Sequence, residues 1–305
     1  MDYFLGVDGG GSKTACVVGS ESSVLASAQS GPSNITRVGE VRARESLHEA
    51  IRRACAAARI DPRQLRYACI GAAGAGRAEI ASVVRNMAAE VIPGEIEVVG
   101  DMQIALQAAL GEGPGVIVIA GTGSIAFGRD AQGKTARAGG WGFAISDEGS
   151  AHWIGRTAVA AVLRSADQSD LSAQQTSPLF REMKSIWKLE SLEELAGTAN
   201  SNPDFATLLP TILAAADSGD ELAQQVLAQA GRELARLASI VMRRLFSEQH
   251  ATVPLAMAGG VFRHAPMIRE LFYNEVRTAH PHVVLNPEVV EPVHGALQLA
   301  RRAAS

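Results

Sequence analysis

Two glycine-rich turns in this chain share one local pattern, and both could bind phosphate. Each turn lies between two short apolar runs. The first turn contains Gly10, Gly11, Ser12, Lys13 and Thr14, and the second contains Gly121, Thr122, Gly123 and Ser124. Glycine lets the backbone approach a ligand closely and point its N–H groups at phosphate oxygens. The repeat predicts two half-domains that bind one polyphosphate between them.

Each turn taken alone has an ordinary alternative. Residues 11–14 end like a P-loop, but Ser12 stands where that motif has glycine, and residues 14–18 read as a strand. The second turn imitates a dinucleotide-binding fingerprint, yet turn residues at 128–133 follow where that fingerprint needs a helix. A single turn of this kind would favour a plain tight hairpin. The pair, with hydroxyl groups in both turns, favours phosphate binding.

Acidic residues stand where carboxylates could do chemistry beside these turns. Asp8 closes an apolar strand next to the first turn, where it could hold Mg²⁺ or hydrogen-bond its own turn. Asp101 ends a predicted strand and precedes a helix, so it could be a base for a hydroxyl nucleophile or an N-cap. Asp147 and Glu148 follow a glycine-rich loop at 139–142, which favours a site for a hydroxyl-rich ligand over simple helix capping.

The composition is typical of a globular chain. Of its 305 residues, 47% are hydrophobic and 20% are charged, and the formal net charge is -4. A protein that binds nucleic acid normally has a basic stripe, which this sequence lacks. No apolar run is long enough for a membrane span, and no signal peptide is predicted. The three cysteines, Cys16, Cys55 and Cys69, have no CxxC spacing, which argues against a disulfide frame or a metal cluster. We therefore expect a cytoplasmic protein.

The order of predicted elements is that of two α/β halves. Strands are expected at 3–7, 14–18, 24–28, 67–70 and 95–99, and helices at 41–58, 80–87 and 104–110. Residues 111–115 form the best linker, so we place a first lobe at 1–113 and a second at 114–292. The second half repeats the hairpin and adds a long helix at 220–249, strands at 253–258 and 283–285, and a helix at 295–302. The end of the chain (about 293–305) could pack back on the first lobe, and residues from about 165 to 215 are expected to form a helical insertion.

Together these features resemble the superfamily of acetate and sugar kinases, actin and heat-shock chaperone ATPases. The glycine hairpins look like its two phosphate loops, and residues 255–261 are similar to its adenosine motif. Five segments resemble the N-acetylglucosamine kinase and BadF/BadG/BcrA/BcrD ATPase family: 6–14, 33–35, 120–124, 139–142 and 146–150. The resemblance implies an α/β fold of two duplicated ribonuclease H-like lobes, the actin-like ATPase fold, with a cleft between them.

The resemblance also implies a role for individual residues. Asp101 falls at the position of the catalytic base, and ATP with Mg²⁺ near Asp8 is implied as the phosphoryl donor. The residues implied to bind the amino sugar are Asn34, Gly140, Trp141, Gly142, Asp147 and Ser124. Those implied to bind the nucleotide are Gly10, Gly11, Ser12, Lys13, Thr14, Gly121, Thr122, Gly123, Gly259 and Gly260. A homodimer is implied as well.

The activity that the resemblance implies is ATP-dependent phosphorylation of an amino sugar, with N-acetylglucosamine to its 6-phosphate as the first choice. Ile125 stands where the similar animal enzyme has a polar substrate-binding residue, and Thr36 replaces a large aromatic residue, so glucosamine is an alternative. Activator ATPases of this family hold an iron–sulfur cluster through cysteines, which the cysteines here do not match. A nucleotide-dependent sugar sensor is the alternative of another class, and Asp101 argues against it because a sensor needs no base.

Overall fold

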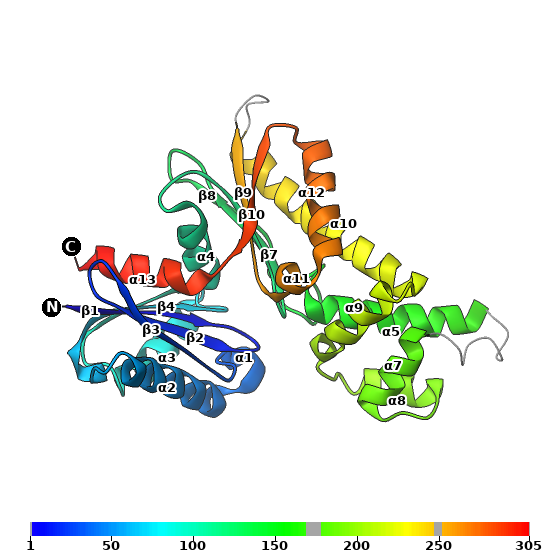
Figure 1. Cartoon of the computed structure of the whole chain (residues 1–305), viewed down its shortest axis with the longest axis horizontal. Helices are drawn as coiled ribbons and strands as arrows, with labels where there is room; N and C mark the ends of the chain where they lie inside the picture. Colours follow the sequence, from blue (N-terminus) through cyan, green and yellow to red (C-terminus); the bar gives the residue numbers. More distant parts are fainter. Residues whose placement is uncertain (1, 169–177, 247–251, 305) are drawn as a thin grey trace.

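The computed structural model describes residues 2–168, 178–246 and 252–304. Within these ranges the chain forms two five-stranded mixed sheets, one in each of two lobes that lie side by side (Figure 1). The last helix returns from the second lobe to the first, so the two termini lie close together at one end of the molecule (Figure 1).

The first sheet consists of three antiparallel strands and two strands that join them in parallel. Its strands are β1 (Tyr3–Gly9), β2 (Thr14–Gly19), β3 (Val24–Ser30), β4 (Leu65–Ala72) and β5 (Glu95–Gly100), in the order β3-β2-β1-β4-β5. The first three pair antiparallel, as their short polar turns allow, and β4 and β5 join in parallel because helices connect them. These connections contain α1 (Ile35–Val38), α2 (Glu40–Ala57), η1 (Pro62–Gln64) and α3 (Ala78–Ala89). The core on this face includes Leu5, Ile51 and Met87.

The second sheet repeats the first. Its strands are β6 (Gly115–Ala120), β7 (Ser124–Arg129), β8 (Thr135–Gly139), β9 (Val253–Ala258) and β10 (Val283–Val290), in the order β10-β9-β6-β7-β8. Again the first three strands are antiparallel and the last two parallel. The long helix α10 (Glu221–Leu245) packs against β6, β7 and β8, and α12 (Pro266–Ala279) lies beside it. The duplication predicted from the two glycine turns is therefore confirmed.

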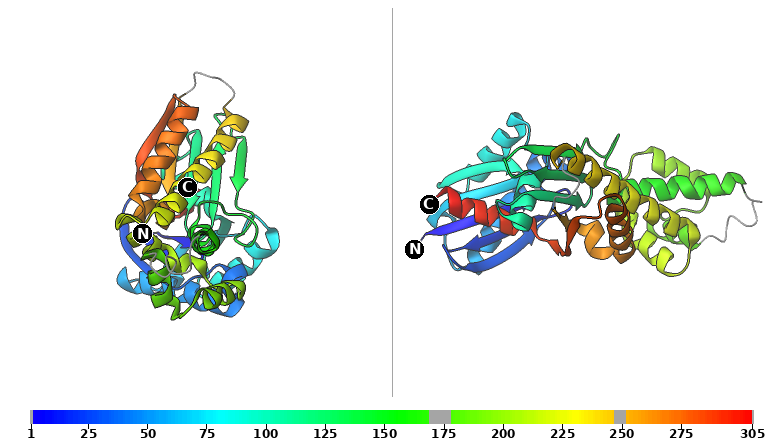
Figure 2. Two further views of the ribbon diagram at one scale, coloured as in Figure 1. Left: turned by 90° about the vertical axis from the view of Figure 1, so that its right-hand side faces the viewer. Right: turned by 90° about the horizontal axis from the view of Figure 1, so that it is seen from above.

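The two lobes exchange helices. Helix α4 (Asp101–Leu110) follows the first sheet, yet it packs Ala105 and Leu106 against β6, β7 and β9 of the second. Helix α13 (Pro292–Ala303) follows the second sheet and packs Ala296 and Leu297 against β1, β2 and β4 of the first. Figure 2 shows α13 lying along the first lobe.

Helix α13 approaches its neighbours at backbone distance on two sides. A Cβ atom at Gly295 would lie 1.9 Å from the carbonyl oxygen of Ile104 in α4. A Cβ atom at Gly6 in β1 would lie 2.4 Å from the backbone nitrogen of Leu297. Such distances leave no room for any side chain, so these two glycines allow α13 to pack tightly between β1 and α4.

A helical insertion extends from the second lobe, away from the first sheet (Figure 1). It contains α5 (Ala151–Gln168), α7 (Pro178–Trp187), α8 (Leu192–Asn200), η2 (Phe205–Leu208) and α9 (Leu209–Asp217). The described part of the predicted insertion at about 165–215 is mainly helical, and residues 169–177 lie outside the described residues. In the described ranges, no helix has both the length and the apolar character needed to cross a membrane.

Several predicted boundaries were wrong by a few residues. Strand β10 runs on to Val290, because Val289 pairs with Met257 after a shift in register. Helix α4 begins at Asp101, and α13 begins at Pro292, where proline is favoured in the first turn of a helix. The last residues of the helix predicted at 220–249 lie outside the described residues.

The contact at Gly295 leads to a stability prediction. Gly295→Ala should lower the free energy of unfolding by about 3 kcal/mol or more, because the added Cβ meets backbone atoms that cannot rotate away. Chemical denaturation measures the change. Gly197→Ala is the matched control, because Gly197 lies in α8 with open space around its Cβ position, and there alanine should stabilise the helix by up to about 1 kcal/mol. Equal stability of Gly295→Ala and wild type would mean that α4 and α13 are not in close contact.

Candidate active site

The two glycine turns meet where the lobes face each other. The first turn connects β1 to β2, the second connects β6 to β7, and each is closed by its own backbone hydrogen bond. The hydroxyl oxygens of Ser12 and Thr122 lie 2.7 Å apart, which is a hydrogen bond between residues 110 positions apart in the chain. The structure thus brings together the two turns that the sequence predicted to share one ligand.

The first turn also holds the segment that carries Asn34. The carbonyl of Gly10 accepts hydrogen bonds from the backbone N–H groups of Ser33 and Asn34, both at 3.2 Å. The hydroxyl of Thr14 is buried, donates to the carbonyl of Gly31 at 2.7 Å and lies 2.8 Å from the hydroxyl of Ser33. Thr14 was predicted to bind nucleotide, but its hydroxyl group is used inside the lobe to fix this segment. Lys13 is exposed beside it.

Asn34 begins the short helix α1. Its side-chain oxygen accepts hydrogen bonds from the backbone N–H of Thr36 at 3.1 Å and from the hydroxyl of Thr36 at 2.7 Å. The side chain is therefore held in one orientation by an N-cap interaction. The amide nitrogen of the same side chain could donate a hydrogen bond to the oxygen of a sugar hydroxyl.

Two carboxylates lie near the carboxyl ends of strands β1 and β5 of the first sheet. Asp8 lies in β1 just before the first turn, and Asp101 follows β5 as the first residue of α4. Loss of hydration raises the pKa of Asp8 to about 7, and the negative charge of Asp101 adds to this shift. Lys13 opposes the shift, and Glu291 adds to it. The two carboxylates are thus near enough to repel each other.

The surroundings of Asp101 fit a base better than a cap. Burial raises the pKa of its carboxyl group, although the backbone N–H of Met102 donates to it at 2.9 Å. The N-cap position of α4 belongs to Gly100, so Asp101 is not the capping residue. A carboxylate with a raised pKa is a stronger acceptor of a substrate proton than an ordinary surface aspartate.

Asp147 joins the second glycine turn to the loop between β8 and α5. Its carboxylate accepts a hydrogen bond from the backbone N–H of Gly142 at 3.2 Å, and a Cβ atom at Gly123 would lie 2.6 Å from its second oxygen. The residue is buried with a φ of 62°, a left-handed conformation that is strained for aspartate. Burial raises its pKa to about 6, and the charges of Glu148 and Asp101 act in the same direction. Gly123 is therefore needed to make room for this carboxylate.

Other residues predicted to bind sugar lie around Asp147. The hydroxyl of Ser124 is buried and donates to the carbonyl of Glu148 at 2.7 Å, so it holds the loop. Trp141 is 67% exposed, and the guanidinium of Arg137 stacks 4.3 Å from its ring centre. Gly140 contacts Ile125, since a Cβ at Gly140 would lie 2.7 Å from the Cδ1 atom of that side chain. Ile125 thus forms an apolar wall beside the loop.

The predicted adenosine motif lies next to the second glycine turn. Gly259 follows β9 with a φ of 100°, and a Cβ atom there would lie 2.3 Å from the carbonyl oxygen of Ala120. Gly260 begins the short helix α11 (Gly260–His264). Glycine at position 259 lets the start of α11 lie close to the second turn, on the side of the sheet edge where the nucleotide is expected.

Among the described residues, Asp8 is not part of a cluster of metal-ligating side chains. In the part of the chain that the structure describes, no group of three or more His, Cys, Asp or Glu side chains is placed to hold a metal ion. Water and phosphate oxygens would have to be the other ligands of a magnesium ion at Asp8, which is how Mg²⁺ is usually bound beside nucleotides. Cys16, Cys55 and Cys69 are all buried in the first lobe.

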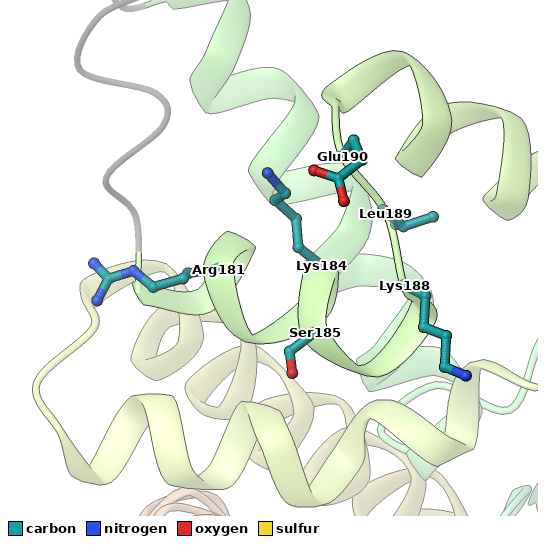
Figure 3. Close-up of a pocket in the computed structure, with 6 residues that line it drawn as sticks. All are labelled: Arg181, Lys184, Ser185, Lys188, Leu189 and Glu190. Carbon is teal, nitrogen blue, oxygen red and sulfur yellow. The ribbon is translucent and has the colours of Figure 1, made fainter.

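A pocket in the helical insertion is not part of this site. Figure 3 shows it on α7 and the turn that follows, with Arg181, Lys184, Ser185, Lys188, Leu189 and Glu190 around it. The three basic side chains point in different directions, so they do not converge on one anion (Figure 3). The meeting place of the two glycine turns is therefore the candidate active site.

Comparison with known proteins agrees with this geometry. The model of the BadF/BadG/BcrA/BcrD ATPase family matches residues 5–300. The chain belongs to this family. It is 33% identical to the N-acetylmuramic acid/N-acetylglucosamine kinase of Clostridium acetobutylicum, with 99% of each chain covered. It is 28% identical to the N-acetyl-D-glucosamine kinase of Dictyostelium discoideum, with 98% of each chain covered.

A solved structure supports the fold. The crystal structure of a candidate N-acetylglucosamine kinase from Chromobacterium violaceum superimposes with a TM-score of 0.77 at 25% identity. The match covers 98% of this chain and 99% of that one. The actin-like ATPase fold that the resemblance implied is thereby confirmed, and so is the family. ATP binding follows from membership of a family of ATPases.

The raised pKa of Asp8 leads to a prediction for the protein without nucleotide or divalent metal. A carboxyl group whose folded pKa is about 7, against a usual 3.8, contributes stability below pH 3.8 that is lost as the pH rises through 7. Asp8→Asn should therefore be more stable than wild type at pH 8, by on the order of 2 kcal/mol, and the difference should shrink towards pH 4. Denaturant unfolding in the presence of EDTA measures it.

Asp61→Asn is the control, because the pKa of Asp61 is shifted in the opposite direction to that of Asp8. Hydrogen bonds from Arg63 lower the pKa of Asp61 to about 2, so its ionised form contributes stability above pH 3.8 that is lost as the pH falls through 2. This variant should gain no stability at pH 8. If Asp8→Asn behaves in the same way, the carboxyl group of Asp8 is not shielded from water in the folded chain as the structure shows it.

Proposed function

We propose that this protein is an ATP-dependent kinase that transfers the γ-phosphoryl group of ATP to the 6-hydroxyl of N-acetylglucosamine. The observation that carries the proposal is the position of Asp101. Its carboxyl group has a raised pKa and lies near Asp8, at the strand ends from which the first glycine turn also starts. The kinase activities named for two relatives that match along the whole chain support the choice of substrate class.

Asp101 is proposed to be the general base. It would accept the proton of the sugar hydroxyl as the hydroxyl oxygen forms its bond to the γ-phosphorus and the bond to the leaving ADP oxygen breaks. Burial helps here, because it raises the affinity of the carboxylate for a proton. The start of α4 fixes the carboxylate through the hydrogen bond from Met102.

The glycine turns and Asp8 are proposed to bind the nucleotide. Backbone N–H groups of the two turns would face the phosphates, with the hydroxyls of Ser12 and Thr122 between the lobes. A bound magnesium ion would neutralise phosphate charge and would also relieve the repulsion between Asp8 and its acidic neighbours. Gly259 and Gly260 would leave room for the adenosine beside the second turn.

The amino sugar is proposed to lie between Asn34 and Asp147. A side-chain amide and a carboxylate, each held by backbone hydrogen bonds, suit sugar hydroxyls. The apolar wall of Ile125 suits an acetyl methyl group, and a charged ammonium placed against it would lose hydration without gaining a partner. Glucosamine is the second candidate, because the negative charges of Asp147 and Glu148 nearby would attract an ammonium group.

The lobe boundaries near residue 113 and residue 292, a homodimer and a cytoplasmic location also remain predictions from the sequence. They do not enter the proposed mechanism, since each residue named in it lies on this one chain.

The role of Asp101 can be tested by a single substitution. Asp101→Asn should lower kcat by roughly 10²–10⁴-fold, as expected for loss of a general base, and leave the affinities for ATP and sugar nearly unchanged. Asparagine keeps the oxygen that accepts the hydrogen bond from Met102, so the local structure should survive. A coupled assay for ADP measures turnover, and calorimetry measures binding. Asp167→Asn, on the exposed face of α5, is the control. A variant with more than a tenth of wild-type turnover would exclude Asp101 as the base.

The substrate can be identified with a panel of sugars. N-acetylglucosamine should give the highest kcat/KM in the ADP assay, at least tenfold above glucosamine at the same pH, because Ile125 offers no partner to an ammonium group. N-acetylmuramic acid and unmodified hexoses complete the panel, with a control lacking sugar. A tenfold preference for glucosamine would contradict the proposed substrate. Sugar binding without turnover of any member would favour a sensor over a kinase.

A further inference from the structure

An ion pair joins the two lobes beside the candidate sugar site. The guanidinium of Arg37, in α1 of the first lobe, lies 2.5 Å from the carboxylate of Asp204 in the helical insertion of the second lobe. Arg37 is only 17% exposed and Asp204 is 46% exposed. The pair is therefore partly shielded from water, which strengthens it relative to a fully exposed pair.

Arg37 is in contact with a candidate sugar-binding residue, Asn34, and with the first glycine turn, which is the candidate nucleotide-binding segment. Its backbone N–H donates to the carbonyl of Asn34 at 3.0 Å, so the two residues share one helical turn. Its Nη1 atom lies 3.5 Å from the position that a Cβ at Gly11 would take, which places it against the first glycine turn. A movement of Arg37 would therefore be passed to Asn34 and to that turn.

Asp204 is held in place within the helical insertion of the second lobe. Its carboxylate caps η2 by accepting a hydrogen bond from the backbone N–H of Ala206 at 3.2 Å. The next residue, Phe205, packs its ring edge-on against His152 at 5.2 Å, and His152 packs against Phe143 at 4.9 Å. Phe143 belongs to the loop that carries Asp147. The insertion thus reaches the candidate sugar-binding loop through three rings in contact, one pair edge-on and one pair tilted.

We propose that Arg37 is a positioning residue, and that its ion pair with Asp204 holds the helical insertion against α1 so that Asn34 and Asp147 face one substrate. The insertion then acts as the second wall of the sugar site. This inference rests on the proposed function for the identity of the ligand. The contact itself does not depend on that identity.

The kinetic test uses variants that remove charge and keep local structure. Arg37→Ala and Asp204→Asn should each raise KM for N-acetylglucosamine, by up to about fivefold, which is the range for a partly exposed ion pair. Asparagine at 204 retains an oxygen to cap η2, so the insertion should stay folded. kcat should change less than KM, the double variant should resemble either single one, and Arg37→Lys should recover part of the loss.

Arg44→Ala is the matched control for this test. Arg44 makes ion pairs with Glu40 at 2.8 Å and Glu90 at 3.2 Å, all within the first lobe. Its removal takes away an arginine and its charge without touching the contact between lobes, so KM and kcat should stay as in wild type. Additive effects of Arg37→Ala and Asp204→Asn, or an equal effect of Arg44→Ala, would contradict the proposal.

A second measurement does not require turnover. Dyes on Glu45→Cys and Glu193→Cys, both exposed, report the distance between α2 and α8, and the native Cys16, Cys55 and Cys69 are buried from the reagent. Arg37→Ala and Asp204→Asn should each shift the distance distribution towards longer values, and the double variant should shift it no further. An unchanged distribution in both single variants would overturn the proposal. If no sugar is phosphorylated but the distances respond, the proposed substrate fails and the coupling of the lobes stands.

Discussion

The close packing of α13 between β1 and α4 joins the two lobes, and the arrangement of the site depends on it. At Gly6 and Gly295 the backbones approach so closely that no side chain could intervene. Each lobe therefore rests on one helix of the same tightly packed pair, α4 beneath the second sheet and α13 beneath the first. Asp101 is the first residue of α4, and Glu291 directly precedes α13. The pair of helices that connects the lobes thus also carries Asp101 and brings the charge of Glu291 near Asp8.

Asp8, Asp101 and Asp147 lower the stability of the folded chain at neutral pH. The pKa values of Asp8, Asp101 and Asp147 are all raised, and for all three the first cause is loss of hydration. Asp61, by contrast, pairs with Arg63 on the surface, and its pKa is lowered. A protein that needed these carboxylates only for structure would gain by pairing them in the same way. Their present arrangement is understandable if each carboxylate binds a proton, a cation or a polar ligand during function.

Much of the fold could be predicted from the sequence, because its signals are local. Apolar runs, glycine turns and short connections specify the hairpins, and the repeat of these signals indicates the duplicated sheet. The exchange of α4 and α13 could not be predicted from local signals, since α4 has apolar residues on more than one face and packs on both halves. Strand β10 was predicted too short because Asn286, Pro287 and Glu288 interrupt its apolar pattern, although the strand continues beyond them.

The candidate site was predictable in composition but not in the direction of its side chains. Hydroxyl residues at 14 and 124 suggested ligand contacts, yet both hydroxyls point inward and fix loops. Gly123 was expected to admit phosphate, and it makes room for the carboxylate of Asp147 as well. Arg37 had no signal of its own, because its partner lies in an insertion more than half the chain away. Contacts of that kind depend on the packed tertiary structure.

The duplication explains why the candidate phosphate-binding and sugar-binding residues come from different structural elements. The tips of the equivalent hairpins β1–β2 and β6–β7 supply the two glycine turns, so the expected phosphate site is made of the same element used twice. The candidate sugar residues come from another equivalent pair, the connections that follow β3 and β8, which carry Asn34 and Asp147. These connections differ greatly in length, because the second contains the helical insertion. A hairpin tip that binds phosphate as proposed can change little without loss of that binding, whereas a connection can lengthen on the surface at small cost in stability. Changes in the sugar that such a protein accepts should therefore arise in the connections, where Arg37 and Asp204 meet.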